Sequence, residues 1–271
     1  MLDIASQVWR SIRPCGTARV YAGTGSGGAG NKVHLFGGQN LDFSVLADCE
    51  VYDVLLDVWM AGPSLTVPRR NLASTTLNDG RILALGGYDG ESIVSVVEAL
   101  DGRMKSWIQL PPLLTPRSSC GAGVLNDGRA FVCGGTTGTR LNSVEVYEPR
   151  VNKWEKFQLP MNEVRSAGAF VSNGQRIFAL GGIDANHAIS CSVEMMDEVS
   201  AHSWVFRQNM FAPRVDLAGC AVDDSIIVAG GQNAGEVFNT VELYDVVKDE
   251  WMHAPEMMFP RYGHSMINVS L

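Results

Sequence analysis

Residues 23–32 read GTGSGGAGNK and contain the glycine spacing that could cradle a phosphate. Gly23, Gly25 and Gly28 match G-x-G-x-x-G, the outline of a dinucleotide loop, and Lys32 follows shortly after. A dinucleotide loop opens a helix at its last glycine, because the pyrophosphate lies at the helix N-terminus. Here a strand pattern, VHLFGG, follows instead, and Lys32 is flanked by Asn and Val rather than by the residues of a G-K-[ST] motif. The run is therefore predicted to be an outer hairpin loop that binds no nucleotide.

Glu194, Glu198 and His202, spaced at four residues, form the second cluster that could do chemistry. Carboxylates and an imidazole can bind iron. Glutamates recur at this place in every repeat, however, at positions 50, 98, 145, 194 and 242. A catalytic residue appears once, so this column of glutamates is interpreted as structural. The chain contains no H-E-x-x-H and no G-x-S-x-G motif. No catalytic residue, metal or cofactor is predicted.

Charge and composition exclude other classes of partner. The net charge is −8 and the pI is near 5.1, without a dense cluster of Lys and Arg, which disfavours nucleic acid and anionic membranes. No apolar run approaches the ~20 residues of a membrane helix. The N-terminus, MLDIASQVWR, lacks the features of a signal peptide. These observations predict a cytoplasmic protein.

The six cysteines form no C-x-x-C pair and fit reduced thiols in such a protein. Cys120, Cys133 and Cys220 fall in strands and are expected to react slowly with thiol reagents, whereas Cys15 is expected to be the most reactive.

The chain is organised by a repeat. Gly-Gly pairs that close an apolar run begin at 37, 86, 134, 181 and 230, with spacings of 49, 48, 47 and 49 residues. Tryptophans stand at 9, 59, 107, 154, 204 and 251, with spacings of 50, 48, 47, 50 and 47. Two independent markers share one period, and a period of this length is typical of solenoids and propellers.

Each repeat contains the same parts in the same order. It opens at an arginine and a short strand of small residues, continues through turns such as NDGR and a second, apolar strand that ends in Gly-Gly, and then has a strand of the VEVYE type and a strand with the tryptophan. The opening arginines are Arg19, Arg69, Arg117, Arg165, Arg214 and Arg261. Four antiparallel strands per period without a helical pattern describe a propeller blade, with each tryptophan packed between neighbouring blades.

The Gly-Gly pair, the V-E-x-Y-D strand and the spaced tryptophan resemble the kelch repeat, and the resemblance recurs five times over nearly the whole chain. It implies an all-β fold in which residues 1–271 form a single kelch β-propeller domain. We expect five complete four-stranded blades plus an incomplete sixth blade formed from the two chain ends. Innermost strands should line the channel and tryptophan strands should lie outermost.

The incomplete sixth blade is expected to combine an outermost strand at Trp9 with an innermost strand at 261–270, without the two middle strands. Continuing the period places a sixth Gly-Gly pair near ~278, so a six-bladed parent would contain roughly 20–25 further residues. The alternative is a five-bladed ring with both terminal segments docked irregularly.

In kelch receptors, which the chain resembles, ligands dock on the loops after Gly-Gly and on the connections into each first strand. The matching positions, one set per repeat, are Tyr21, Gln39, Asn40, Asn71, Tyr88, Asp89, Ser119, Thr136, Thr137, Ala167, Ile183, Asp184, Asp216, Gln232 and Asn233. None is an arginine, although Arg70 and Arg140 lie near, so a neutral or basic segment of a partner fits better than an acidic peptide.

The resemblance to the propeller of BTB-kelch adaptors implies a protein-interaction module rather than an enzyme. Such a module binds a partner protein or peptide around the central channel, in some cases as the substrate receptor of a cullin-type ubiquitin ligase, through domains outside this sequence. The alternative is a kelch-fold enzyme such as a sialic acid epimerase.

Overall fold

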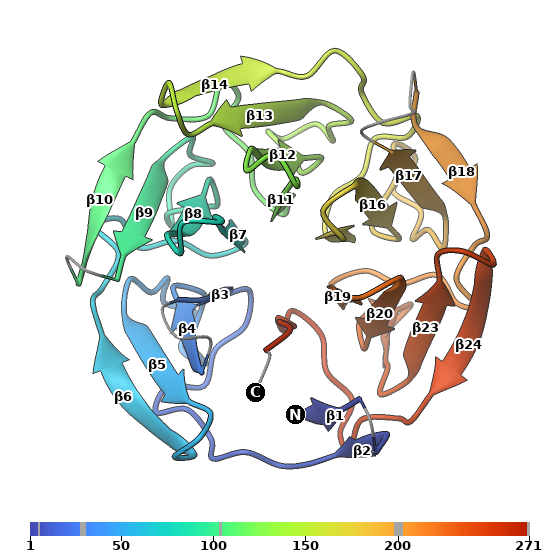
Figure 1. The fold of residues 1–271 in the computed structure, drawn as a ribbon, viewed down its shortest axis with the longest axis horizontal. Helices are drawn as coiled ribbons and strands as arrows, with labels where there is room; N and C mark the ends of the chain where they lie inside the picture. Colours follow the sequence, from blue (N-terminus) through green and yellow to red (C-terminus); the bar gives the residue numbers. More distant parts are fainter. Residues whose placement is uncertain (5, 28–30, 103–104, 198–202, 270–271) are drawn as a thin grey trace.

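Twenty-four strands and no helix occur in the computed structural model, which describes residues 1–4, 6–27, 31–102, 105–197 and 203–269. Five antiparallel four-stranded sheets surround a central channel as the blades of a propeller (Figure 1). With no helix in these residues, the described chain contains none that could cross a membrane. The all-β propeller expected from the repeat is confirmed.

In each blade the four strands lie side by side, and their order from the channel to the outer rim follows their order in the sequence. Blade 1 contains β3 (Gly23–Ser26), β4 (Lys32–Phe36), β5 (Cys49–Asp53) and β6 (Val58–Gly62). Blade 2 contains β7 (Ala73–Thr76), β8 (Ile82–Leu85), β9 (Val97–Asp101) and β10 (Ser106–Leu110). Blade 3 contains β11 (Gly121–Val124), β12 (Ala130–Cys133), β13 (Val144–Glu148) and β14 (Lys153–Lys156).

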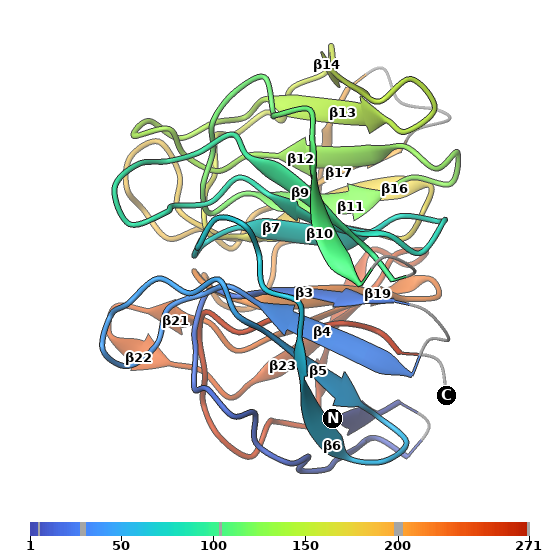
Figure 2. The ribbon, with the colours of Figure 1, turned by 90° about the vertical axis from the view of Figure 1, so that its left-hand side faces the viewer.

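The last two blades follow the same order. Blade 4 contains β15 (Ala169–Ser172), β16 (Arg176–Leu180), β17 (Val193–Asp197) and β18 (Val205–Arg207). Blade 5 contains β19 (Ala218–Val222), β20 (Ser225–Ala229), β23 (Val241–Asp245) and β24 (Glu250–Ala254). A short ribbon of β21 (Gln232–Asn233) and β22 (Glu236–Val237) projects from blade 5 at one end of the propeller (Figure 2).

The core lies between blades, because the second strand of each blade presents side chains to both neighbours. Leu83 and Leu85 in β8, for example, pack with Ala130 and Val132 in β12, and all four side chains are buried. A continuous apolar run is what a strand covered on both faces requires.

The burial of each cysteine depends on its place in this packing. Cys133 and Cys49 are buried, whereas Cys120, Cys220 and Cys15 are partly buried, and all six thiols are free. Burial raises the pKa of Cys120 to about 11 and that of Cys220 to about 12, which disfavours the reactive thiolate. Slow labelling of Cys120, Cys133 and Cys220 stays a prediction.

The glycine run is not an outer hairpin loop along its whole length. Gly23–Ser26 form β3, an innermost strand, and Lys32 begins β4, while residues 28–30 lie outside the described residues. A Cβ on Gly23 would lie 2.5 Å from the ring of Phe36, and a Cβ on Gly25 would lie 2.4 Å from Ile82 in blade 2. The first glycines therefore allow close packing within blade 1, at Gly23, and against blade 2, at Gly25.

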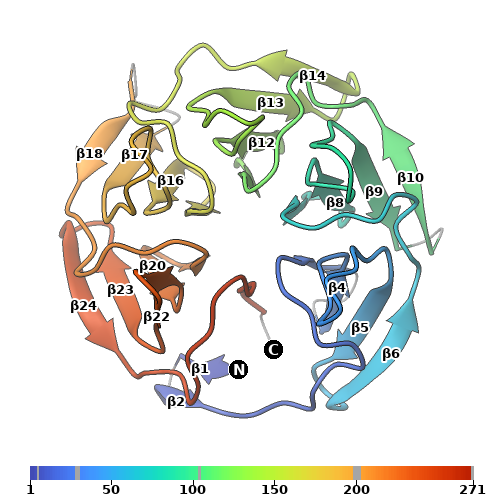
Figure 3. The same ribbon diagram turned by 180° about the vertical axis from the view of Figure 1, so that it is seen from behind.

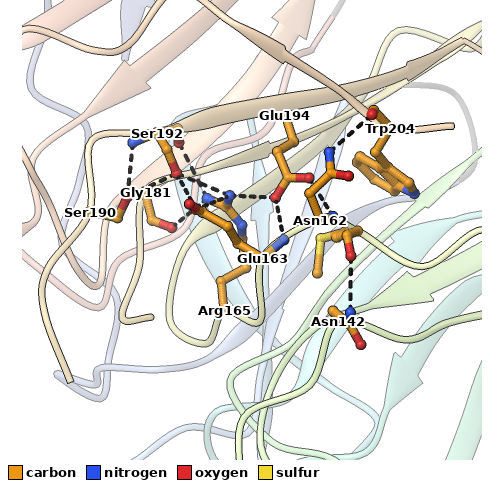
Figure 4. A network of polar contacts seen from close by, with 10 residues as sticks. Asn142, Asn162, Glu163, Arg165, Gly181, Ser190, Ser192, Glu194 and Trp204 are labelled. Atoms are coloured by element: carbon orange, nitrogen blue, oxygen red, sulfur yellow. Dashed lines mark hydrogen bonds and ion pairs between the residues drawn. The ribbon is translucent and has the colours of Figure 1, made fainter. Parts of the chain in front are cut away.

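The column of glutamates is structural, as expected, and its partners are the opening arginines. Arg165 donates from Nη2 to Glu194 Oε1 (2.7 Å) and from Nη1 to the carbonyl of Gly181 (3.0 Å), as Figure 4 shows. The Glu194 carboxylate also accepts the amides of residues 162 and 163. The same ion pair recurs in the other blades as Arg19–Glu50, Arg69–Glu98, Arg117–Glu145 and Arg214–Glu242.

The tryptophans join neighbouring positions at the outer rim. Each indole Nε1 donates to a main-chain carbonyl of the preceding connection, over 2.7–3.1 Å. The pairs are Trp9–Pro255, Trp59–Arg13, Trp107–Pro63, Trp154–Pro111, Trp204–Leu159 and Trp251–Gln208. Because Trp9 bonds to residue 255, the first and last parts of the chain meet at this rim.

The two chain ends occupy the place between blade 5 and blade 1, which we call the sixth position (Figure 1). A sixth blade is not confirmed: β1 (Leu2–Asp3) and β2 (Val8–Trp9) form a separate two-stranded sheet, and residues 261–269 contain no assigned strand.

The expectation that both middle strands are missing here was wrong in one respect. Leu2 pairs with Trp9 in the register that joins Tyr52 to Trp59 in blade 1, so β1 corresponds to the end of a third strand. Gln7 and Asp57, at matching turns, share a positive φ of 56° and 52°.

Candidate functional site

The predicted binding residues lie at equivalent places in the five blades. In each blade the residue after Gly-Gly forms an antiparallel bridge with the residue after the opening arginine. The bridges are Val20–Gln39, Arg70–Tyr88, Ser118–Thr136, Ser166–Ile183 and Val215–Gln232. The loops that follow these bridges surround one mouth of the channel, the end at which β22 projects (Figure 3). We call this surface the loop face.

The innermost candidates form a closed ring of main-chain hydrogen bonds. Each donates its amide to the carbonyl of the equivalent residue in the preceding position, over 2.7–3.0 Å. The ring runs through Tyr21, Asn71, Ser119, Ala167, Asp216 and Gly263 and returns to Tyr21. All six residues have φ between 51° and 60°, the left-handed region that L-residues rarely adopt. Gly263 supplies the sixth member, so the ring closes through the C-terminal segment.

The channel behind this ring encloses about 470 Å³ and is lined by small and hydroxyl side chains. Several hydroxyls bond to the neighbouring blade: Ser74 Oγ accepts the amide of Thr24, and Ser172 Oγ donates to the carbonyl of Val124. Among the described lining residues Asp216 is the one carboxylate. It accepts hydrogen bonds from Gln232 Nε2 (3.0 Å) and the Tyr21 hydroxyl (3.4 Å), and burial raises the pKa of both Asp216 and Tyr21. Of the channel-lining residues that the structure describes, none places a second carboxylate opposite Asp216, as a paired acid and base would require.

Three candidates shape their own loops. The Oδ1 atoms of Asn40, Asp89 and Asp184 each accept two main-chain amides from residues two to four positions further along. These amide bonds, that of Ser92 foremost, lower the pKa of the Asp89 carboxyl. Asp and Asn side chains commonly close turns in this way. These side chains primarily hold the loops in place.

The Thr136–Thr137 pair of candidates has a similar role in blade 3. Thr136 Oγ1 donates to the carbonyl of Thr139 and accepts the amide of Gly138, and the hydroxyls of Thr137 and Thr139 lie 3.4 Å apart. In blade 5, Asn233 lies in β21, opposite Glu236 of β22.

Blades 1 and 2 bring together an ordered aromatic and cationic group. Arg70 donates from Nη1 to Gln39 Oε1 (2.9 Å), and its guanidinium carbon lies 5.1 Å from the centroid of the Tyr88 ring. The Tyr88 hydroxyl donates to the carbonyl of Gly90. Gln39 is buried, whereas Arg70 and Tyr88 are partly exposed. Cation–π contact and the two hydrogen bonds hold Tyr88 in one orientation.

The loop after the first Gly-Gly pair contributes two residues that sequence reasoning missed. Leu41 and Phe43 are 82% and 81% exposed, the highest values among the large apolar side chains described. The sequence did contain a signal for these two residues. The loop after Gly-Gly reads QNLDF in blade 1, whereas the equivalent loops read TTGTR in blade 3 and QNAGE in blade 5 and contain no large apolar residue. Gly90 of the neighbouring loop lies near Val45, so the loop that carries both apolar residues adjoins the Tyr88 loop.

Negative charge dominates the loop face. Arg70 and Arg140 are both engaged, Arg70 with Gln39 and Arg140 with Nδ1 of His187 at 3.2 Å, whereas Arg261, whose carbonyl accepts the amide of Gly231 beside this face, is exposed. The carboxylates are Asp42, Asp89, Glu91, Asp184, Asp216 and Glu236. A surface on which carboxylates outnumber arginines attracts neutral or cationic groups.

The alternative iron cluster gains no support from the described residues. Glu194 is engaged with Arg165, while Glu198 and His202 lie outside the described residues. No group of three His, Cys, Asp or Glu residues elsewhere in the described chain is arranged to hold a metal ion.

Two family models match this sequence. The KLHDC2/KLHL20/DRC7 Kelch-repeats domain matches residues 1–182, and the Kelch motif matches residues 213–258. Together they cover the five Gly-Gly pairs and all the tryptophans of the repeat except Trp204.

Curated relatives have similar sequences over part of their length. Kelch-like protein 26 from Danio rerio is 27% identical over 239 residues, which are 83% of this chain and 39% of that protein. Alpha-scruin from Limulus polyphemus is 28% identical over 47% of this chain and 14% of its own length. F-box/kelch-repeat protein SKIP30 from Arabidopsis thaliana is 28% identical over 43% of this chain and 36% of its own. The chain thus spans about two fifths or less of these relatives.

A solved structure shares the fold. The structure titled "Structure of YjhT" superposes with a TM-score of 0.76 over 91% of this chain and 86% of that one, at 14% sequence identity. At this identity the likeness extends to the fold alone.

Proposed function

Because the chain belongs to the kelch-repeat family, we propose that it is a protein-interaction module that binds a partner protein or peptide through the loop face. The observation that carries the proposal is the group formed by Tyr88, Arg70 and Gln39, together with the exposed Leu41 and Phe43 of the loop that begins at Gln39. Oriented aromatic and arginine side chains next to exposed apolar ones are the composition of interaction hot spots. The remaining loops supply a polar rim.

The partner presents a neutral or basic segment. The six carboxylates of the loop face outnumber Arg70 and Arg140, which are already engaged with Gln39 and His187. Neither of these two arginines is free to bind an acidic peptide. Apolar side chains of the partner contact Leu41 and Phe43, and its polar or cationic groups meet the carboxylates.

The module acts in the cytoplasm as the substrate-binding part of a larger assembly, in the manner of a receptor for a cullin-type ubiquitin ligase. The similarity to Kelch-like protein 26, of which the matched segment is 39%, and to an F-box/kelch-repeat protein supports this extension. The free cysteines fit a reducing compartment. The proposal includes no catalytic step, since Asp216 is bonded to Tyr21 and Gln232 rather than paired with an acid or base.

Affinity purification from cell lysate, followed by binding measurements with the purified partner, tests the proposal. Tyr88→Ala should weaken binding by on the order of 2 kcal/mol, because a hot-spot aromatic is lost, and Phe43→Ala should weaken it as well. Phe206→Ala is the matched control, since Phe206 is an exposed aromatic on β18 at the outer rim. Lys32→Ala, at the start of β4, should also be silent. Loss of binding in the controls with retention in Tyr88→Ala would place the partner on another surface.

A further inference from the structure

In three blades the third strand carries a tyrosine whose hydroxyl donates to a side-chain oxygen at the next turn, over 2.6–2.7 Å. The pairs are Tyr52–Asp57, Tyr147–Asn152 and Tyr244–Asp249. Each tyrosine ring also lies against the tryptophan of its own blade, with ring centroids 4.9–5.1 Å apart. An aromatic ring with a bonded hydroxyl is thus a regular part of these blades.

Blade 2 differs at both members of this pair. Leu100 pairs with the tryptophan of its blade in the register in which Tyr147 pairs with its own, so a leucine takes the place of the tyrosine. Lys105 takes the place of the acceptor: it precedes the tryptophan by two residues with a φ of 53°, as Asn152 does with a φ of 54°. Phe36 of blade 1 contacts the blade 2 tryptophan instead, at 4.8 Å between ring centroids. Blade 2 therefore lacks a phenol, and a cation replaces its acceptor.

The facing wall of blade 1 contains a histidine where other blades have an apolar residue. His34 in β4 has as its equivalents Leu83, Phe131 and Phe178, which are fully buried. Burial lowers the pKa of His34, against the opposing effect of a hydrogen bond to the main chain of Gly25, so the imidazole is neutral at neutral pH. Its Nδ1 atom is buried and has no hydrogen-bond partner among the described residues. A buried polar atom of this kind calls for a partner.

A second lysine begins the same strand. Lys32 has the place that Arg81 has in blade 2, where the guanidinium lies beside the hydroxyl of Tyr147 in the next blade. Lys32 and Lys105 are exposed, and neither forms an ion pair with another residue in the described part of the chain. The two positions that elsewhere surround a phenol hydroxyl are thus both cationic here.

The four exceptional residues line one cavity of about 320 Å³ between blades 1 and 2, namely His34, Lys32, Leu100 and Lys105. Val51 and Ile82 belong to its apolar walls. None of the described lining residues is a carboxylate. The volume lies at the lower end of the range for small-molecule sites. Apolar walls, one unpartnered ring nitrogen and two lysines suit a small planar anion.

We propose that this cavity binds a small aromatic carboxylate that carries a ring hydroxyl. The ring packs against Leu100, the hydroxyl donates to Nδ1 of His34, and the carboxylate forms ion pairs with Lys32 and Lys105. The ligand supplies the ring that blade 2 lacks and the negative charge that the two lysines lack. Because Lys32 begins β4 and the loop face follows the end of that strand, the cavity is distinct from the surface proposed for the partner.

The probe is 4-hydroxybenzoate, titrated into the purified protein by isothermal calorimetry. We expect saturable binding at a single site. A protein with both Lys32→Ala and Lys105→Ala should bind it about tenfold more weakly, since charge-assisted hydrogen bonds are lost. The parent protein should bind 4-hydroxybenzamide, which has no negative charge, equally weakly.

Two further variants test the ring and the hydroxyl separately. Leu100→Tyr combined with Lys105→Asn reproduces the pair of blade 3, fills the cavity and should abolish binding. His34→Leu should weaken binding of 4-hydroxybenzoate about fivefold, because one hydrogen bond is lost. The same variant should bind benzoate, which has no hydroxyl, as the parent protein does.

Lys153→Ala is the matched control, because Lys153 is an exposed lysine on β14 of blade 3. It should bind 4-hydroxybenzoate like the parent protein. Urea unfolding of each variant checks that the fold is retained. The proposal would be overturned if 4-hydroxybenzoate does not bind, if the double lysine variant binds it unchanged, or if 4-hydroxybenzamide binds as tightly. Undiminished binding to the variant with the filled cavity would overturn it too, by placing the probe elsewhere.

Discussion

Arg165 and Arg261 occupy the same place in two repeats, and their main chains are bonded alike. The carbonyl of Arg165 accepts the amide of Gly135 at 2.9 Å, and that of Arg261 accepts the amide of Gly231 at 2.9 Å. The side chains differ: Arg165 is buried against Glu194, whereas Arg261 is exposed. Main-chain bonds therefore close the ring at all six positions, while buried ion pairs link the strands within five of them.

The buried arginines of the complete blades and the exposed Arg261 have different electrostatic requirements. A buried guanidinium needs a carboxylate and further acceptors, because desolvation of an unpaired charge is costly. Each opening arginine in a complete blade therefore depends on strands two and three of that blade. Arg261 avoids the cost by remaining in contact with solvent.

Replacing Glu145 with alanine should produce the largest effect. Glu145 pairs with the buried Arg117 and also accepts the amides of Leu114 and Thr115. The change leaves a buried unpaired charge, so the free energy of unfolding should fall by about 3–5 kcal/mol. Urea unfolding monitored by circular dichroism measures it. Arg261→Ala should alter stability by less than about 0.5 kcal/mol; comparable losses in both variants would show that Arg261 is engaged after all.

A smaller effect is expected from pH at the sixth position. His264 occupies the slot held by Leu72 in blade 2 and Leu217 in blade 5, and neither ring nitrogen has a partner among the described residues. Burial, and then the nearby charge of Arg261, lower the pKa of His264 to about 4. Because the unfolded chain takes up a proton on His264 at higher pH than the folded protein does, the free energy of unfolding is highest above the unfolded pKa of about 6.5. It decreases as the pH falls toward 4.

The change should amount to about 3 kcal/mol between pH 7 and pH 4. The His264→Leu variant, which reproduces the complete blades, should lack it, so the stability difference between parent and variant should widen as the pH falls. Unfolding in urea at several pH values gives both curves. Parallel curves would mean that His264 is solvated in the folded protein.

The smallest difference in stability between a complete blade and the sixth position is expected for the tryptophans at the outer rim. Trp154 is buried and donates to the carbonyl of Pro111, whereas Trp9 is partly exposed and donates to that of Pro255. Trp154→Phe should cost about 2 kcal/mol and Trp9→Phe about 1 kcal/mol, since both lose the hydrogen bond but less buried area is lost at Trp9. Thermal unfolding of both variants measures the difference. Equal costs would indicate that the outer rim is closed as firmly at the sixth position as elsewhere.

Much of the blade architecture could be predicted from the sequence, because each blade repeats one set of contacts. The buried Gly-Gly strands and the tryptophans recur at a fixed period, so one assignment applied to all blades. The glutamates were recognised as structural because they recur. Their partner was not identified, since nothing in the sequence shows that Arg165 folds back onto Glu194.

The errors fall where the repeat is broken. The glycine run was assigned to a loop because it precedes the apolar strand at the place where other repeats have a hairpin turn, whereas Gly23–Ser26 form the innermost strand and pack closely against Phe36 and Ile82. The third-strand character of β1 could have been found, since Asp3 and Trp9 have the spacing of Asp53 and Trp59. On the loop face, the sequence located the candidate positions but could not distinguish Asn40 and Asp89, which close turns, from Tyr88, which is oriented by Arg70.

The hydrogen-bonded ring of left-handed residues separates recognition from folding. Its bonds use main-chain atoms alone, and the side chains at its six members are Tyr, Asn, Ser, Ala, Asp and Gly. Diversification of these positions would therefore leave closure of the propeller unchanged, provided that β-branched residues, which tolerate positive φ poorly, are left out. A combinatorial library at these positions would vary the chemistry at the channel mouth on a constant backbone, and the same freedom would let duplicated genes acquire new ligands without losing the scaffold.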